Sequence, residues 1–257
     1  GLTLNLTKYN IAGIDSKYSS GVKGLNRLTK IFERKHQWFI IIYTVFYLLG
    51  FKLLEMKVNN RYYIIHMELD DWIPFCEYFI IPYVLWFFYI AAAVAYFALA
   101  NKNLKEYWQL IISLGIGMTL FLVISWIYPN GQELRPVVFE RDNIFTDMVK
   151  MLYQMDTPTN IFPSIHVFNS VAVGIAIWKC EALQKHWLLR RSAIVLSILI
   201  VLSTMFLKQH SVWDVVCALA LNAVVYIFVY IPGEQWAEFF GQRRRNKRLQ
   251  KGLQDTI

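Results

Sequence analysis

The stretch YFIIPYVLWFFYIAAAVAYFALA, residues 78–100, carries no charged side chain from end to end. An uncharged helix needs about 20 residues to cross roughly 30 Å of hydrocarbon, and this stretch reaches that length. Apolar residues make up 56% of the chain and aromatic residues 16%, which is more than a soluble domain of 257 residues needs to fill its core. The sequence therefore predicts an integral membrane protein.

Five further stretches reach or approach the same length with few charged residues. They are residues 37–51, 107–128, 160–178, 192–207 and 215–233. We therefore expect an all-α fold, a polytopic six-transmembrane-helix bundle formed by one membrane domain over residues 36–235. Residues 1–35 are expected to form a cytoplasmic basic amphipathic segment, and residues 236–257 a basic cytoplasmic tail.

Lysine and arginine are distributed unequally between the two sides of this bundle. If the amino terminus lies inside, 19 of them fall in cytoplasmic segments and 7 on the opposite side. Because basic residues are retained in the cytoplasm, we expect a multi-pass plasma-membrane protein with both termini cytoplasmic. Anchoring to anionic headgroups then explains the formal charge of +8. Nucleic-acid binding is the weaker interpretation, since no separate basic domain remains.

Three polar segments then share the extracytoplasmic side of the membrane. They are Leu134-Arg135-Pro136, Phe162-Pro163-Ser164-Ile165-His166 and Lys208-Gln209-His210-Ser211-Val212-Trp213-Asp214. Together they hold two histidines, a carboxylate and an arginine, which are the groups needed to move a phosphoryl group through a phosphohistidine. The topology therefore predicts an active site on the extracytoplasmic face.

His210 and Asp214 are four residues apart, so on a helix they share a face and the carboxylate can accept a hydrogen bond from the imidazole. Such a partner fixes the tautomer, leaves the other ring nitrogen free to attack phosphorus, and stabilises the positive ring that results. The alternative interpretation is an ordinary interfacial histidine beside a helix-capping aspartate.

The other two segments offer phosphate ligands and a proton donor. Pro163 and Ser164 suit the first turn and the cap of a helix, where free amides and the helix dipole favour an anion. His166 could protonate the departing alcohol as general acid, and the planar fork of Arg135 matches two phosphate oxygens. Structural alternatives are a satisfied membrane-edge histidine and an arginine that anchors in headgroups. No metal is required, no cofactor is expected, and no cluster has metal-ligand spacing.

These residues resemble the three signatures of the phosphatidic acid phosphatase type 2 superfamily, K-x6-R-P, P-S-G-H and S-R-x5-H-x3-D. The likeness covers about residues 35–235. It implies a six-helix catalytic domain in which His166 is the general acid, His210 the nucleophile and Asp214 the residue that orients it. Arg135 and Ser164 match phosphate ligands of the family.

Three signature positions differ from the family pattern. The expected lysine is Tyr128, the glycine is Ile165 and the arginine is Thr204, so two phosphate-binding cations are missing. Lys208 could replace one if it turns inward, and Tyr128 can donate a neutral hydrogen bond. The segment before His210 is similar to inositol phosphorylceramide synthases, and residues 69–75 are similar to an outer segment of bacterial relatives of that branch.

Three functions stay open at this stage. The first is an integral-membrane lipid phosphatase that cleaves a phosphate ester or diphosphate of a lipid. The second is a headgroup phosphotransferase acting on phospholipids or sphingolipids, because a site with fewer cations suits a phosphodiester. The third is a non-catalytic protein that binds lipid phosphates; a transporter is weaker, since few polar residues lie deep in the helices. The expected partners are the lipid substrate and the bilayer, and the oligomeric state is not predicted.

Residues 142–155 form a further amphipathic pattern on the outer side. Apolar residues recur there at three- and four-residue intervals, while Asp147, Lys150 and Gln154 fall on the other side. This pattern predicts an outer interfacial helix. It could act as a lid that guides an acyl-chain substrate, or it could only pack over the end of the bundle.

Overall fold

The computed structural model describes residues 35–57 and 62–231, and these residues are mostly helical. The predicted amino-terminal segment up to residue 34 and the tail 236–257 lie outside the described residues. The elements are α2 (Lys35–Met56), β1 (Tyr63–Ile64), α3 (Glu68–Trp72), η1 (Glu77–Phe79), α4 (Ile80–Ala95), η2 (Tyr96–Ala100), α5 (Leu104–Ile127), β2 (Asn130–Gly131), α6 (Ile144–Met155), α7 (Ile165–Lys179), η3 (Glu181–Leu183), α8 (Trp187–Phe206) and α9 (Val212–Val229).

The chain divides into two compact units, residues 1–46 and residues 47–257. In the first unit the described part is the beginning of α2. Its apolar side chains are largely exposed, including Trp38 at 52%, Ile42 at 66% and Phe46 at 60%. Apolar surface of this extent along a helix is typical of a segment that faces lipid.

Five helical segments among the described residues are long and apolar enough to cross a membrane, which indicates a membrane protein. They are Gln37–Met56, Glu77–Ala100, Leu104–Ile127, Trp187–Phe206 and Val212–Val229. The sixth predicted span contains α7, which is apolar but has only 15 residues. At 1.5 Å per residue such a helix is about 22 Å long, so it is shorter than a usual membrane-crossing helix.

The boundaries of two predicted spans differ from the observed helices for local reasons. The span 160–178 begins as a loop, because Ser164 caps the helix that starts only at Ile165. The span 192–207 begins earlier, at Trp187. Arg190 lies in this added turn and donates to the Trp178 carbonyl at 2.7 Å, so the helix extends past the charged residues that ended the apolar pattern.

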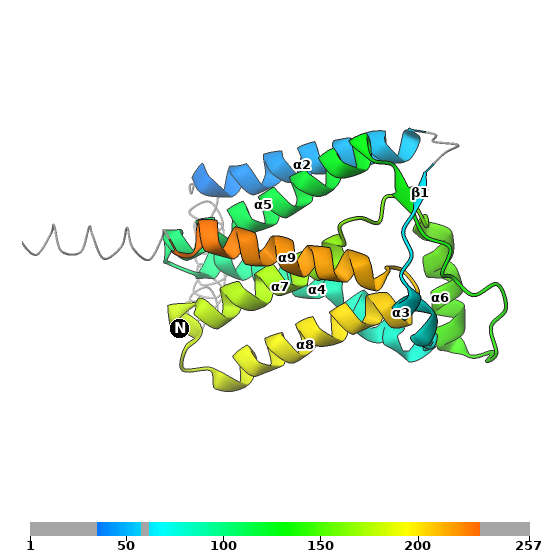
Figure 1. The fold of residues 1–257 in the computed structure, drawn as a ribbon. Helices are drawn as coiled ribbons and strands as arrows, with labels where there is room; N and C mark the ends of the chain where they lie inside the picture. Colours follow the sequence, from blue (N-terminus) through cyan, green and yellow to red (C-terminus); the bar gives the residue numbers. More distant parts are fainter. Residues whose placement is uncertain (1–34, 58–61, 232–257) are drawn as a thin grey trace, which may run out of the picture. The chain divides into compact units, whose positions relative to one another are not determined.

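In the second unit, α7 is the central helix and contacts α4, α5, α8 and α9 (Figure 1). Ten of its fifteen residues are buried, as expected for a helix with apolar or small residues all round. Its neighbours approach closely. A Cβ added at Gly117 of α5 would lie 2.1 Å from the Phe168 ring, so a glycine is required where these two helices meet.

Buried polar side chains join the helices around α7. Ser197 of α8 donates to the Ser170 carbonyl at 2.9 Å, and the Tyr89 hydroxyl of α4 lies 3.0 Å from Ser197 Oγ. On the other side, Asn222 of α9 donates to the Phe168 carbonyl at 3.1 Å. Because buried polar groups need partners, these bonds fix the register of α4, α8 and α9 against α7.

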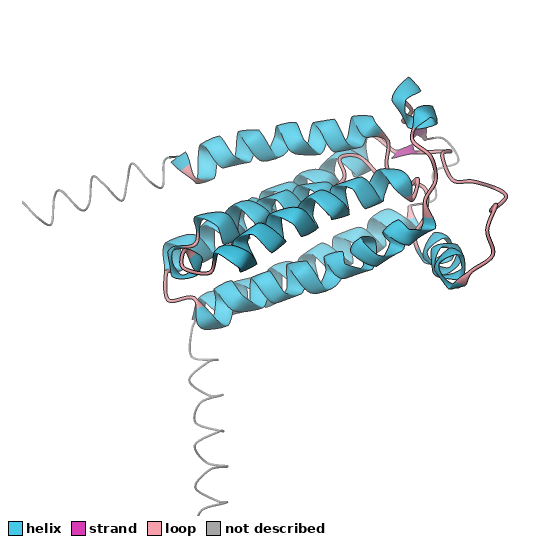
Figure 2. Cartoon of the chain, turned by 90° about the horizontal axis from the view of Figure 1, so that it is seen from below, coloured by secondary structure: helices cyan, strands magenta, loops and turns pink. Residues whose placement is uncertain are grey.

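Strands β1 and β2 lie at one end of the helices of the second unit (Figure 1). Strands β1 and β2 pair in parallel, with Tyr63 opposite Asn130 and Ile64 opposite Gly131. Helices α3 and α6 lie at the same end, and α6 runs across the direction of the longer helices (Figure 1), so that it is seen end-on in Figure 2. The loops that carry the three predicted motif segments meet at this end.

Helix α6 has the amphipathic character that the sequence predicts, but its apolar residues divide into two faces. Val149 is fully buried in a cluster with Ile80, Tyr83 and Leu207. A second row is exposed: Ile144 at 69%, Met148 at 37%, Met151 at 61% and Met155 at 81%. The helix therefore packs over the end of the bundle and also presents an exposed apolar stripe.

Candidate active site

The beginning of α9 holds the predicted His210–Asp214 pair in the expected geometry. His210 Nδ1 lies 3.3 Å from Asp214 Oδ2, and the two side chains are 7% and 0% exposed. The same carboxylate oxygen accepts the Ser211 amide at 3.1 Å, while Ser211 caps the helix. Asp214 is thus both a helix-capping residue and a hydrogen-bond partner that orients the imidazole.

His166, in the first turn of α7, lies beside His210. Their ring centroids are 5.7 Å apart at an angle of 57°. Two residues of α4 also contact His166: the centroid distance is 4.7 Å to Tyr83 and 4.3 Å to Trp86. The two imidazoles are therefore near enough to contact one phosphoryl group, and aromatic rings hold the position of His166.

Arg135 connects the first motif segment to the third. Its Nη2 donates to Gln209 Oε1 at 2.6 Å, and its Nη1 donates to the carbonyls of Tyr153 at 3.2 Å and Asp156 at 2.8 Å. The guanidinium also lies 4.5 Å from the centroid of the Tyr153 ring. Burial lowers the pKa of Arg135, and the Asp156 carboxylate acts in the opposite direction. These contacts hold the guanidinium against Gln209, the residue that directly precedes His210.

Several buried polar atoms of this region have no hydrogen-bond partner among the described residues. They are Arg135 Nε, His166 Nδ1, Gln209 Nε2, Trp86 Nε1 and Asp214 Oδ1. Buried donors without a partner are costly and are concentrated at sites that bind ligands. Each of the three motif segments thus contributes a buried polar atom without a partner, namely Arg135 Nε, His166 Nδ1 and Gln209 Nε2.

A second carboxylate, Asp70 of α3, holds the backbone that carries His210. Its carboxylate accepts hydrogen bonds from the Ser211 hydroxyl at 2.6 Å and from the Val212 amide at 2.7 Å. It also accepts one from the Met67 amide, which precedes α3, at 2.8 Å. Asp70 is 2% exposed. It satisfies free donors at the beginning of α9 and therefore positions both His210 and Asp214.

The segments that carry Arg135, His166 and His210 fall within one stretch of the chain that matches a known family. Residues 106–236, about half of the chain, match the model of the PAP2 superfamily. The chain belongs to the PAP2 superfamily. Searches of curated proteins and of solved structures returned no match to this chain. PAP2 proteins are typically phosphoesterases, and the matched part of the chain contains Arg135, Ser164, His166, His210 and Asp214.

The side chains of Tyr128 and Thr204, at two of the variant PAP2 positions, contact groups other than the two histidines. Tyr128 ends α5, is 41% exposed and stacks on Tyr63 with centroids 4.4 Å apart. Thr204 Oγ1 donates to the Val201 carbonyl within its own helix. The Thr204 carbonyl, however, accepts the amides of Gln209 and His210 at 2.9 and 3.1 Å, so Thr204 supports the turn that carries His210.

Lys208 turns toward α3 and away from Arg135. Its ammonium donates to the Asp70 carbonyl at 2.6 Å, and its backbone has a positive φ of 53°. Burial lowers the pKa of Lys208, while Asp70 and Asp71 act in the opposite direction. In the described conformation the Lys208 ammonium is thus bonded to α3.

Ser164 lies where the second PAP2 signature predicts, at the beginning of α7. It is fully buried, and its hydroxyl accepts the Val167 amide at 3.4 Å. The capping serine thereby directs the first turn of α7, including His166, toward the third signature.

Three residues of this region were missed by the sequence argument: Asp70, Asp156 and Gln209. Gln209 directly precedes His210, and Asp156 lies, like Arg135, in the connection between α5 and α7, so position along the chain was the available signal. Asp70 belongs to the segment 69–75 that was noticed only as a resemblance. Asp70 and Tyr83 lie outside the PAP2 match, which begins at residue 106.

The role of Asp70 can be tested with Asp70→Asn, which keeps one acceptor oxygen but leaves one donor near α9 unsatisfied. We expect kcat to fall about 10- to 100-fold, because a shift of His210 of roughly 1 Å costs that much. Asp71→Asn is the matched control, since the exposed Asp71 side chain pairs with His66 at the surface, whereas Asp70 accepts hydrogen bonds from the beginning of α9. Steady-state kinetics should show the loss in the first variant; equal rates in both variants would contradict the role of Asp70.

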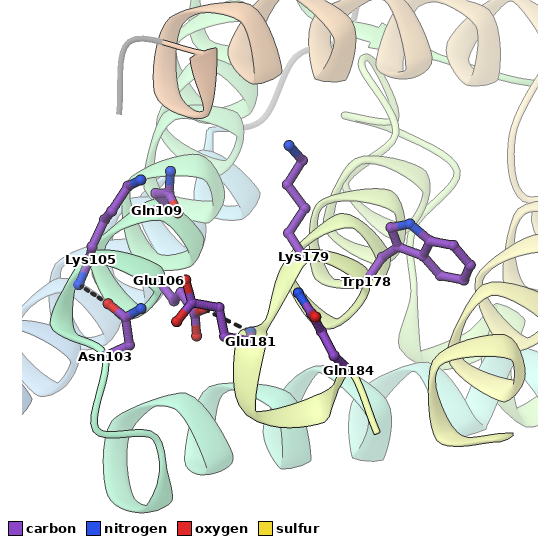
Figure 3. Close-up of a pocket in the computed structure, with 8 residues that line it drawn as sticks. All are labelled: Asn103, Lys105, Glu106, Gln109, Trp178, Lys179, Glu181 and Gln184. Carbon is purple, nitrogen blue, oxygen red and sulfur yellow. Dashed lines mark hydrogen bonds between the residues drawn. The ribbon is translucent and has the colours of Figure 1, made fainter. Parts of the chain in front are cut away.

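A separate pocket of about 400 Å³ is lined by eight residues from the beginning of α5, the end of α7 and the turn that follows (Figure 3). One of these residues is Glu106. Its carboxylate accepts the Asn101 side chain at 2.7 Å and the Glu181 amide at 2.9 Å, so it joins two chain connections. None of the PAP2 signature residues lines this pocket.

Within residues 35–57 and 62–231, no three His, Cys, Asp or Glu side chains are grouped as a metal site would require.

Proposed function

We propose that the protein is a metal-independent lipid phosphatase that cleaves a phosphate ester or diphosphate of a lipid through a phosphohistidine. The observation that carries this proposal is the pairing of the His166 and His210 rings, 5.7 Å apart, with Asp214 3.3 Å from His210. Membership of the PAP2 superfamily supports the reaction class.

The reaction proceeds in two balanced steps. His210 Nε2 attacks phosphorus and forms an N–P bond while the P–O bond to the lipid breaks, and His166 donates a proton to the departing oxygen. Asp214 stabilises the positive imidazole of His210. Water then attacks phosphorus, its proton passes to His166, the N–P bond breaks and phosphate leaves.

The negative charge of the phosphoryl group is balanced by donors rather than by several cations. Arg135 supplies the guanidinium, and the beginning of α7 at Ser164 supplies the positive end of a helix. Lys208, Thr204 and Tyr128 remain candidate ligands that would need to change their present contacts in order to reach the phosphate.

The proposed membrane arrangement has six spans, with α7 as the short central one. Both termini lie in the cytoplasm of the plasma membrane and the active site on the extracytoplasmic face, as the lysine and arginine distribution indicates. The exposed stripe of α6 would lie in the membrane interface. A membrane-impermeant thiol reagent should therefore label a cysteine engineered into the loop 136–142 on intact cells; labelling only after lysis would reverse this orientation.

A headgroup phosphotransferase is the second candidate. It is favoured by the present contacts of Lys208 and Thr204, because the Lys208 ammonium is bonded to the Asp70 carbonyl and the Thr204 hydroxyl to the Val201 carbonyl. It is also favoured by the resemblance to the branch that contains inositol phosphorylceramide synthase. In that reaction a lipid alcohol replaces water in the second step.

The deciding experiment supplies purified protein with lipid phosphomonoesters, lipid diphosphates and phosphodiesters, with and without a lipid alcohol. A phosphatase releases inorganic phosphate or a water-soluble phosphate ester, whereas a transferase forms a new phospholipid in proportion to the added alcohol. Binding of these lipids with no product from any of them would favour a non-catalytic lipid-phosphate-binding protein and contradict the proposal.

A further inference from the structure

Asp156 is a carboxylate beside the candidate phosphate site that belongs to none of the PAP2 signatures. It directly follows α6, and its side chain accepts the Tyr83 hydroxyl at 3.3 Å. Its backbone carbonyl accepts Arg135 Nη1 at 2.8 Å. Tyr83 in turn stacks on His166, so Asp156 is connected to the guanidinium and to one of the two histidines.

The carboxylate of Asp156 also interacts electrostatically with the reacting groups. Burial raises the pKa of Asp156, and His210, Arg135 and the Tyr83 hydroxyl act in the opposite direction. These three groups come from different segments, and all lie near the same carboxylate. The Asp156 carboxylate, bonded to Tyr83, therefore lies within electrostatic range of the guanidinium and of His210.

The balance of charge at this site is unusual for a phosphate site. Arg135 contributes one positive charge, and ionised Asp156 contributes one negative charge close to it. The Asp214 carboxylate is hydrogen-bonded to His210, and the Lys208 ammonium is hydrogen-bonded to the Asp70 carbonyl. A phosphate bound at Arg135 would therefore experience the field of the Asp156 carboxylate as well as that of the guanidinium.

We propose that Asp156 determines which charge state of a lipid phosphate is accepted, by opposing phosphomonoesters with two negative charges more strongly than phosphodiesters with one. This inference rests on the proposed function and names the substrate class of that site. Electrostatic repulsion grows in proportion to the charge of the ligand, so one fixed carboxylate costs a dianion about twice what it costs a monoanion. A phosphomonoester carries nearly two charges above pH 7.

The chemistry of a diester is the same two-step reaction. His210 forms the N–P bond, the bond from phosphorus to the diacylglycerol oxygen breaks, and His166 protonates that oxygen. Water or an alcohol then attacks phosphorus, its proton passes to His166 and the N–P bond breaks, so that the released phosphate still carries the second ester group. The preference for one charge state thus concerns binding and needs no further reactant.

The test compares two lipids that differ only in charge, phosphatidic acid and phosphatidylmethanol with identical acyl chains. Equilibrium binding to detergent-solubilised protein is measured at pH 8 for the wild type and for Asp156→Asn. Asparagine keeps an oxygen that can accept the Tyr83 hydroxyl but removes the charge. We expect the ratio of the two dissociation constants to shift at least tenfold toward phosphatidic acid, which is about 1.4 kcal/mol.

Two control variants separate charge from structure. Asp147→Asn removes the same charge from the exposed side of α6, where Asp147 pairs with Lys150, and should leave the ratio unchanged. Tyr83→Phe removes the hydroxyl that Asp156 binds but keeps the carboxylate, and should also leave the ratio unchanged. If Tyr83→Phe shifts the ratio as Asp156→Asn does, Asp156 acts by holding Tyr83 and the proposal is wrong.

The outcomes also distinguish this inference from the proposed function. An unchanged ratio in Asp156→Asn, together with turnover that depends on His210, would overturn only the role of Asp156. Failure of the wild type to bind either lipid would overturn both. A tenfold shift confined to Asp156→Asn would support the charge-selecting role, and diacylglycerol release from each lipid gives the same ratio as a kinetic readout.

Discussion

Replacing His210 by alanine is expected to lower turnover of every substrate by about 10⁴-fold or more, because no other group in the site can take over the role of an activated nucleophile. The His210 imidazole is 7% exposed and lies 3.3 Å from Asp214, so its removal also leaves a buried carboxylate without this partner. The measurement is the initial rate of product release from the preferred lipid.

A comparison with His166→Ala separates the roles of the two histidines. Loss of a general acid costs about 10²- to 10⁴-fold for a lipid alcohol leaving group. It should cost much less for an activated aryl phosphate, whose leaving group needs no proton. His210→Ala should fail equally with both substrates. His186→Ala, at the exposed beginning of α8, is the control; full turnover in His210→Ala would remove the phosphohistidine mechanism.

Replacing Arg135 by lysine is expected to lower kcat/KM about 100-fold although the positive charge is kept. Lysine cannot reproduce the planar fork that donates to Tyr153, Asp156 and Gln209, and a point charge on a flexible stem is held less rigidly. The effect therefore measures the orientation of the guanidinium rather than its charge. Kinetics across a range of lipid concentrations should show the loss.

The control for this substitution is Arg141→Lys, in the segment that follows Arg135. Arg141 pairs at 3.2 Å with the buried Glu77, and a lysine can keep that pair. We expect its kcat/KM to stay within about twofold of the wild type, since the positive charge is kept and Asn143 also donates to Glu77. Equal losses in both variants would show that Arg135 contributes only to stability.

The parts of the site that the sequence predicted are those with a local cause. The four-residue spacing of His210 and Asp214 places them together on any helix, and Pro163 with Ser164 predicts where α7 begins. Five of the predicted spans were recognised because uncharged stretches of that length are typical of membrane helices. The short length of α7 was not predicted, since the apolar pattern continues into a loop that the helix does not include.

The missed parts depend on contacts between distant segments. Asp70 reaches Ser211 across more than a hundred residues, and the Tyr83 ring reaches His166 from another helix; no periodicity encodes either contact. The direction of Lys208 is likewise decided by the carbonyl of Asp70. Apolar spacing identified α6 but could not tell that Val149 would be buried while Met151 and Met155 remain exposed.

The most direct test of the account is to trap the phosphoenzyme. Protein mixed with a lipid labelled with ³²P in its phosphate is quenched in alkali within a single turnover, digested and analysed by mass spectrometry. The account predicts a phosphoryl group on His210 that is stable in alkali and lost in acid, and none in His210→Ala. Label on Ser164 or another residue, or product formed in a burst without any labelled histidine, would contradict it.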